Sequence, residues 1–129
     1  MTRLTLFRCA GAALLLGIGA CAPDEPMPGE MKATLVSPNG PEGAAVIEIA
    51  GNFPDIVPSG GVYLYSHVAD GVTRIVLVRQ APDNIVYWLF VDDTRNPPET
   101  TVLQVSAPDN TLRSLTAGYH VQYETVGAQ

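Results

Sequence analysis

Hydrophobic and polar residues alternate with a period of two through most of the chain after residue 30. A period of two is typical of β-strands, because successive side chains of a strand point to opposite faces. Seven segments rich in Val, Ile, Tyr or Thr are predicted to be strands. They are residues 31–36, 44–50, 62–68, 72–79, 85–92, 101–106 and 118–125.

Turn-forming residues separate these segments. Ser37-Pro38-Asn39-Gly40 and Pro58-Ser59-Gly60-Gly61 are typical turn sequences, and Asp70-Gly71 between residues 62–68 and 72–79 predicts a tight hairpin. Short strands in an uninterrupted series, with no helical segment between them, favour an antiparallel sandwich. The predicted fold class is all-β, a β-sandwich of about seven antiparallel strands.

The alternation also predicts which side chains are buried. Tyr119, Val121 and Tyr123 share one face of the last strand, and polar residues occupy the other face. Ile47 and Ile49 flank Glu48 in the same way. Residues 85–91 are apolar throughout, so this strand is predicted to be central and covered on both faces.

The start of the chain has the features of a secretory signal. Met1–Arg8 contains two arginines and no acid, and Cys9–Ala20 is apolar and rich in small residues. Twelve helical residues span about 18 Å, which is shorter than the roughly 30 Å hydrocarbon core of a bilayer. The segment is therefore expected to direct export rather than to span a membrane.

The end of this segment, Ile18-Gly19-Ala20-Cys21, resembles the lipobox of bacterial lipoproteins. That resemblance implies cleavage between Ala20 and Cys21, and attachment of a diacylglyceryl group to the Cys21 thiol. Two or more acyl chains anchor a protein stably, whereas one does not. The alternative is an ordinary signal peptide, cleaved after Ala20 or Ala22, with Cys21 left as a free thiol.

The lipobox divides the chain into three parts. Residues 1–20 form the signal peptide, residues 21–30 a lipidated cysteine with a Pro-rich tether, and residues 31–129 the β-sandwich domain. Cys9 lies in the leader, so the mature chain keeps one cysteine and has no internal disulfide. The expected location is the cell envelope. Because Ala22 follows the cysteine, lipoprotein sorting implies the outer membrane or its periplasmic face in a Gram-negative cell.

The charge of the chain argues against one class of partner. The formal net charge is −6, and removal of Arg3 and Arg8 with the leader leaves five basic residues against thirteen acidic ones. Binding to a phosphate backbone requires clustered Lys and Arg. We therefore expect no nucleic-acid partner, and membrane lipid is the partner expected at Cys21.

The strand layout of the mature part is similar to the immunoglobulin-like and cohesin-like sandwiches of bacterial surface proteins. The cysteine pair and core-tryptophan spacing of true immunoglobulin domains are absent. The resemblance to these families therefore predicts neither a ligand nor a binding face for this chain.

Few residues offer catalytic chemistry. His67 and His120 are the two histidines, and no serine lies in a nucleophile elbow. We expect both histidines to be solvated strand residues and the protein not to be an enzyme. The alternative is a small envelope hydrolase acting through His67 or His120.

A metal site has weak candidates. Asp92, Asp93, Asn96 and Glu99 offer oxygen ligands of the kind that calcium prefers, but their spacing does not match a calcium loop. An acidic turn is the expected structure, with no metal and no cofactor.

Aromatic residues are the remaining candidates for ligand binding. Tyr63, Tyr65 and Trp88 could stack against sugar rings, although core packing is the default for aromatic residues in alternating strands. The predicted function is a membrane-anchored, non-enzymatic binding or structural module with a protein or carbohydrate ligand. Three aromatic residues exposed in a row would favour a carbohydrate, and a bare apolar patch would favour a protein.

Overall fold

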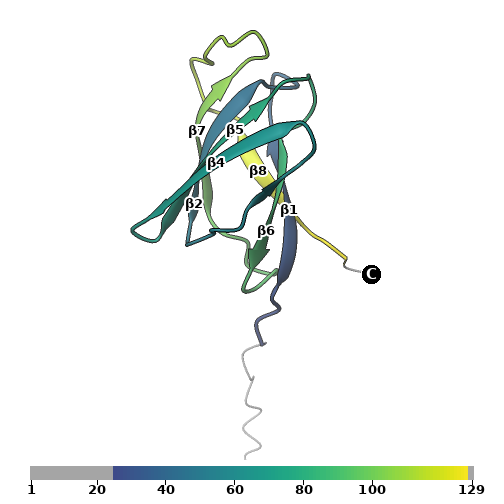
Figure 1. Cartoon of the computed structure of the whole chain (residues 1–129), viewed down its shortest axis with the longest axis vertical. Helices are drawn as coiled ribbons and strands as arrows, with labels where there is room; N and C mark the ends of the chain where they lie inside the picture. Colours follow the sequence, from purple (N-terminus) through teal and green to yellow (C-terminus); the bar gives the residue numbers. More distant parts are fainter. Residues whose placement is uncertain (1–24, 128–129) are drawn as a thin grey trace, which may run out of the picture.

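The computed structural model describes residues 25–127, which form two stacked antiparallel sheets (Figure 1). The eight strands are β1 (Gly29–Val36), β2 (Ala44–Ala50), β3 (Val57–Pro58), β4 (Val62–Ala69), β5 (Val72–Arg79), β6 (Val86–Val91), β7 (Thr100–Ser106) and β8 (His120–Thr125). This part of the chain contains no helix, so the predicted all-β sandwich is confirmed. In the same residues, no segment has the length and apolarity of a membrane-spanning helix.

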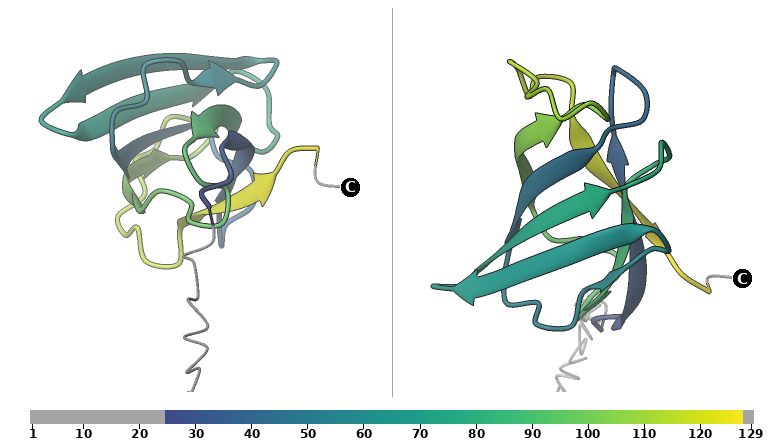
Figure 2. Two further views of the ribbon diagram at one scale, coloured as in Figure 1. Left: turned by 90° about the horizontal axis from the view of Figure 1, so that it is seen from below. Right: turned by 45° about the horizontal axis from the view of Figure 1, so that its top comes forward.

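Each sheet contains four strands. The first has the order β3-β6-β1-β8 and the second the order β4-β5-β2-β7. Every named pairing is antiparallel. Figure 2 shows the two layers from two further directions, with the β4–β5 hairpin reaching out beyond the rest of the sandwich.

The facing sides of the two sheets form one apolar core. Tyr87 of β6 is fully buried, as are Ile47 of β2, Ile75 and Leu77 of β5, and Leu89 of β6. The predicted alternation is confirmed, because Ile47 and Ile49 are both inaccessible to solvent while Glu48 between them is half-buried. Tyr119 is buried, and Val121 and Tyr123 pack against the core from the same face of the last strand.

The predicted hairpin is confirmed. Asp70 and Gly71 connect β4 to β5 with φ angles of 53° and 75°, so both residues are left-handed, as a two-residue type I′ turn requires. The ladder that follows pairs Ala69 with Val72 and continues to Val62 and Arg79.

The prediction that residues 85–91 are covered on both faces is wrong. β6 lies between β3 and β1, and its outward side chains remain accessible: Phe90 is 63% exposed and Trp88 is half-buried. A continuous apolar run gives no information on which face the second sheet covers. The result is an aromatic strip on the outside of the first sheet.

Several strand boundaries differ from the sequence prediction by one or two residues. β6 spans Val86–Val91 instead of residues 85–92, and the last strand begins at His120 instead of residue 118. β1 begins at Gly29, two residues earlier than the predicted domain boundary at Met31. β3 was not predicted because it has only two residues, too few to show any periodicity.

Candidate binding surfaces

The outer face of the β3-β6-β1-β8 sheet carries the most distinctive surface of the molecule. Trp88 lies opposite Lys32 of β1 on one side and opposite Val57 of β3 on the other. Phe90 lies two residues further along β6, on the same face. We call this surface the Trp88 groove. It consists of Trp88, Phe90 and the residues that line two hollows beside Trp88, which are described next.

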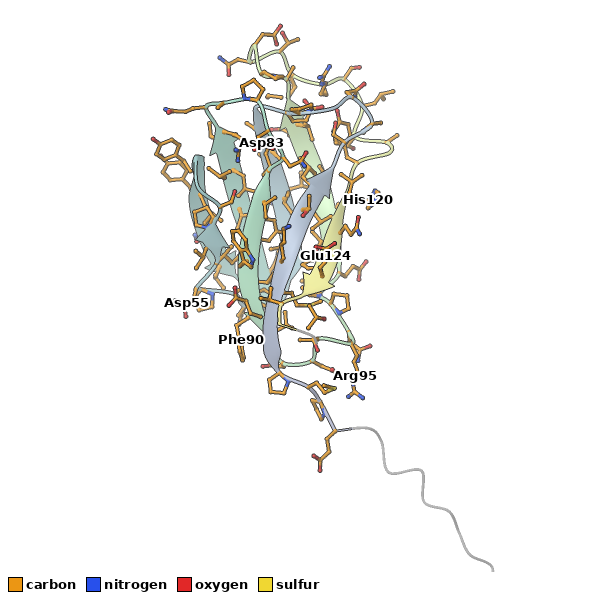
Figure 3. The ribbon with its side chains drawn as sticks, turned by 90° about the vertical axis from the view of Figure 1, so that its right-hand side faces the viewer. Asp55, Asp83, Phe90, Arg95, His120 and Glu124 are labelled. Atoms are coloured by element: carbon orange, nitrogen blue, oxygen red, sulfur yellow. The ribbon has the colours of Figure 1, made fainter. Side chains whose placement is uncertain are left out.

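The first hollow has a volume of about 340 Å³ and joins the two aromatic side chains to two carboxylates. It is lined by Glu30, Asp55, Val57, Trp88, Leu89 and Phe90. Figure 3 views this face, with Phe90 and Asp55 together toward its lower end. This hollow therefore places carboxylate acceptors beside an aromatic surface.

The second hollow lies on the other side of Trp88 and has a volume of about 360 Å³. Polar residues dominate its lining: Lys32, Ser59, Arg79, Asp83 and Asn84 join Trp88 and Val86. Asp83 marks the upper end of this face in Figure 3. Trp88 is common to the linings of both hollows, so they adjoin on this face of the sheet.

The polar groups of the second hollow differ in whether they have hydrogen-bond partners. Arg79 donates to the carbonyl oxygens of Ala81 (3.0 Å) and Gly60 (3.4 Å) and to Asp83 Oδ2 (3.1 Å). The Ser59 hydroxyl oxygen is buried and has no hydrogen-bond partner. A buried hydroxyl without a partner is costly, so Ser59 is an unfavourable feature of this loop.

The structure separates the three aromatic residues that the sequence grouped. Tyr63 and Tyr65 lie on β4 in the second sheet, 51% and 66% exposed, where they pair with Val78 and Val76 of β5. Trp88 lies on the outer face of the first sheet. The three residues therefore do not share one surface, and Phe90 is the aromatic neighbour of Trp88 that the sequence analysis missed.

The two histidines are also separated. His67 is exposed on β4, opposite Arg74 of β5, whereas His120 is exposed at the start of β8, opposite Val36 of β1. They belong to different sheets. No catalytic pair is formed by these two residues.

The acidic loop after β6 has a structural role. Asp93 accepts hydrogen bonds from Arg95 Nε (3.1 Å), from Asn96 Nδ2 (2.8 Å) and from the backbone N–H of Met27 (3.3 Å). The side-chain hydrogen bond from Arg95 is the main reason that the pKa of Asp93 is held well below its usual range. Within residues 25–127, no cluster of three or more His, Cys, Asp or Glu side chains is arranged to hold a metal ion.

The same loop fixes the start of the described chain. Thr94 N–H donates to the Met27 carbonyl oxygen (2.8 Å), and Arg95 donates to the Glu25 carbonyl oxygen. Figure 3 shows Arg95 beside the point where the chain reaches the sandwich. Residues 25–28, predicted as part of a tether, are thus bound to the domain, while Ala20 and Cys21 lie outside the described residues.

A buried acid at the opposite end of the sandwich was not predicted. Glu42 is 2% exposed and accepts hydrogen bonds from Ser37 Oγ (2.8 Å), Tyr119 OH (2.8 Å) and Arg113 Nε (3.1 Å). Burial alone would raise the pKa of Glu42, but the hydrogen bonds from Tyr119, Ser37 and Arg113 outweigh it and lower the pKa below its usual value. Glu42 sits in a Gly-Pro-Glu-Gly turn, which gave no sign of burial.

Comparison with known proteins does not assign this chain to a family. No protein family, no curated protein and no solved structure is significantly similar to this chain. The likeness to immunoglobulin-like and cohesin-like sandwiches therefore stays a prediction.

Proposed function

We propose that this chain is a lipid-anchored protein of the bacterial cell envelope that displays a non-enzymatic β-sandwich binding module close to the membrane. The lipobox ending at Cys21 supports the anchor. The observation that carries the proposal is the fixed start of the domain: only three residues separate Cys21 from Glu25, whose carbonyl oxygen binds Arg95. A modified Cys21 lies at most about 14 Å from the end of the sandwich.

The anchor is tested by replacing the thiol that would carry it. Labelled fatty acid should enter the wild-type chain and not Cys21→Ser, because the serine hydroxyl is not the acceptor used by lipoprotein processing. The variant should also lose membrane association. A Cys9→Ser chain is the matched control, since the lipobox contains only Cys21. Equal labelling of wild type and Cys21→Ser would remove the lipoprotein proposal.

The module is proposed to bind rather than to catalyse. His67 and His120, the residues of the hydrolase alternative, lie in different sheets and both point to solvent. The Trp88 groove, by contrast, combines an aromatic surface with carboxylates, cationic side chains and an amide. Binding sites typically combine an apolar lining with a few polar groups in this way.

A carbohydrate is the ligand class that we propose for the Trp88 groove, on the basis of Trp88 and Phe90 alone. Tyr63 and Tyr65 lie on the other sheet, so the predicted row of three aromatic residues is not formed. A sugar ring offers an apolar face for stacking on Trp88 and hydroxyls for the polar groups around it. The hollows on either side of Trp88 allow a chain of several rings to continue past it. Three carboxylates (Glu30, Asp55, Asp83) face two cations (Lys32, Arg79), so the groove favours a neutral sugar over a strongly charged ligand.

This ligand class is tested by calorimetric titration with neutral tetrasaccharides of glucose and of N-acetylglucosamine. Trp88→Ala should weaken binding about tenfold or more, because an aromatic stacking surface contributes on the order of 1 kcal/mol beyond its burial. Trp88 is the only tryptophan in the chain, so its fluorescence reports binding to the wild type directly. Tyr65→Ala, on the other sheet, is the control. Equal affinity of wild type and Trp88→Ala would exclude the groove as the sugar site.

A further inference from the structure

The free edge of β4 is a second distinctive surface feature of the described residues. β4 is an edge strand of eight residues, Val-Tyr-Leu-Tyr-Ser-His-Val-Ala, with no proline and no Asp, Glu, Lys or Arg. Residues 65–69 are all exposed, so this end of the strand overhangs the sandwich (Figure 2). Soluble proteins normally protect an edge of this length, because it can pair with another strand.

The hairpin fixes which backbone groups of β4 face outward. A two-residue turn makes the flanking residues, Ala69 and Val72, a hydrogen-bonded pair, and such pairs alternate along an antiparallel ladder. Tyr63, Tyr65 and His67 therefore bond to β5. The N–H and C=O groups of Leu64, Ser66 and Val68 point away from β5.

Two hydrogen bonds confirm this alternation. Val62 and Arg79 are partners in register, yet Val62 N–H donates to the Ser59 carbonyl oxygen (3.1 Å) and Arg79 N–H to the Gly43 carbonyl oxygen (2.8 Å). Both groups face away from each other, as a non-hydrogen-bonded pair requires. Leu64, Ser66 and Val68 follow Val62 at intervals of two and share its orientation.

The other edges of the described sandwich are protected. β3 has two residues, one of them Pro58. β7 has a register shift near Leu103, and the chain after it folds back so that Arg113 N–H donates to the Val105 carbonyl oxygen (2.8 Å). β8 carries Glu124, and its Tyr123 hydroxyl bonds to Thr100 of β7. Within residues 25–127, β4 alone lacks every one of these protections.

We propose that the β4 edge binds an extended segment of another polypeptide, which adds to the β4-β5-β2-β7 sheet as a fifth strand. Leu64, Ser66 and Val68 present donors and acceptors repeating at about 6.8 Å, a spacing that a second extended backbone matches. Leu64 and Val68 project on one side of the edge, and Tyr63 and Tyr65 on the other. The partner segment therefore carries uncharged residues, with apolar side chains on the face that covers Leu64 and Val68.

A second copy of this chain fits the edge less well than a different polypeptide. Antiparallel pairing of two β4 strands requires a two-fold axis perpendicular to the sheet. That rotation turns one sandwich end over end, so residues 25–28 of the two copies would point in opposite directions. Two chains anchored at Cys21 in one leaflet cannot meet in this way; this step alone rests on the proposed anchor.

The test is amide hydrogen exchange on the full chain in detergent, with and without an acetylated, amidated eight-residue peptide of alternating Val and Thr. Without peptide, the amides of Leu64, Ser66 and Val68 should exchange at least about tenfold faster than those of Tyr63, Tyr65 and His67. The peptide should slow the three fast amides. Cys21→Ser should bind the peptide equally well, so failure of the anchor would not be mistaken for failure of the edge.

Two variants check that the edge is the site. Ser66→Pro removes an outward N–H without breaking the ladder to β5, and should weaken peptide binding about tenfold or more, while Ser66→Ala should bind normally. Val68→Lys tests the same edge in the event that the proline variant does not fold. Unchanged binding by the folded variants would overturn the proposal. Protection of the three amides without peptide, lost on dilution, would assign the edge to a second copy and would also overturn it.

Discussion

Glu42 links two distant parts of the chain through a single carboxylate. Its hydrogen bonds to Ser37, Tyr119 and Arg113 join the loop after β1 to the long connection between β7 and β8. A buried charge is stabilising only when its partners remain in place. The loops at this end of the sandwich are therefore joined by a polar network in addition to the apolar packing of Tyr119.

We predict that Glu42→Gln lowers the free energy of unfolding by about 2 kcal/mol at pH 7, because the amide loses the charge-assisted hydrogen bonds. Urea denaturation measures the loss. Asp55→Asn is the control, since Asp55 is exposed and should have little effect. An unchanged unfolding midpoint in Glu42→Gln would show that the network contributes nothing.

The pH dependence of the same variant follows from the lowered pKa of Glu42. A carboxylate whose pKa is lower in the folded state contributes stability that is complete above its unfolded pKa, about 4.3, and is lost as pH falls through the folded value. Wild type should therefore exceed Glu42→Gln in stability at pH 7, and the difference should shrink below about pH 4. Urea midpoints measured from pH 7 to pH 3 test this; a difference independent of pH would contradict it.

The hairpin between β4 and β5 depends on the conformation of one glycine. Gly71 has φ of 75°, and an added Cβ at that position would meet no atom within 4 Å. Backbone strain is thus the only cost of a side chain there. We predict that Gly71→Ala lowers the free energy of unfolding by about 1 kcal/mol, measured by thermal or urea denaturation.

Gly60→Ala is the matched control for this hairpin prediction. Gly60 also has open space around it, but its φ is not in the left-handed region. The substitution should leave stability unchanged or raise it slightly, since alanine restricts the unfolded chain. If both variants lost the same free energy of unfolding, the left-handed conformation of Gly71 would not be the cause of the loss.

At the level of strands, the sequence predicted what depends on local patterns. β2 and β5 have the predicted bounds, and the Asp70-Gly71 turn was recognised from its residues alone. Strand pairing is not local, however. Tyr63, Tyr65 and Trp88 look alike in the sequence, and only the pairing of β4 with β5 and of β6 with β1 assigns them to different sheets.

The candidate binding surfaces were less predictable than the strands. Phe90 belongs to an apolar run whose covered face cannot be inferred from the run itself. Ser59 and Asp83 come from loops that only the fold brings beside Trp88. The uncharged β4 sequence was visible from the start, but its position at an edge follows from the sheet order.

At the scale of the whole molecule, the first described residues are held against the sandwich by the loop after β6. Asp93 accepts the Met27 N–H, and Met27 in turn accepts from Thr94. We predict that Asp93→Ala speeds exchange of the Met27 and Thr94 amides about tenfold or more while the amides of β1 keep their protection. Hydrogen exchange followed by NMR measures this.

Asp92→Ala is the control for the Asp93 substitution. Asp92 is exposed, and none of the hydrogen bonds that hold residues 25–28 involves it, so its removal should leave both amides protected. If Asp93→Ala left the Met27 amide equally protected, residues 25–28 would be held by something other than this loop.

Because residues 25–28 are bound to the domain, an anchor at Cys21 would limit where this protein can meet a ligand. With an anchor at Cys21, the covalent reach of the residues up to Glu25 would keep the sandwich within about 14 Å of the lipid attachment. Its strands of up to eight residues rise only about 26 Å from the end where the described residues begin. Both the Trp88 groove and the β4 edge lie on the flanks rather than at the far tip. A glycan or peptide strand would thus have to run alongside the bilayer, within one molecular height of the lipid headgroups, to be caught.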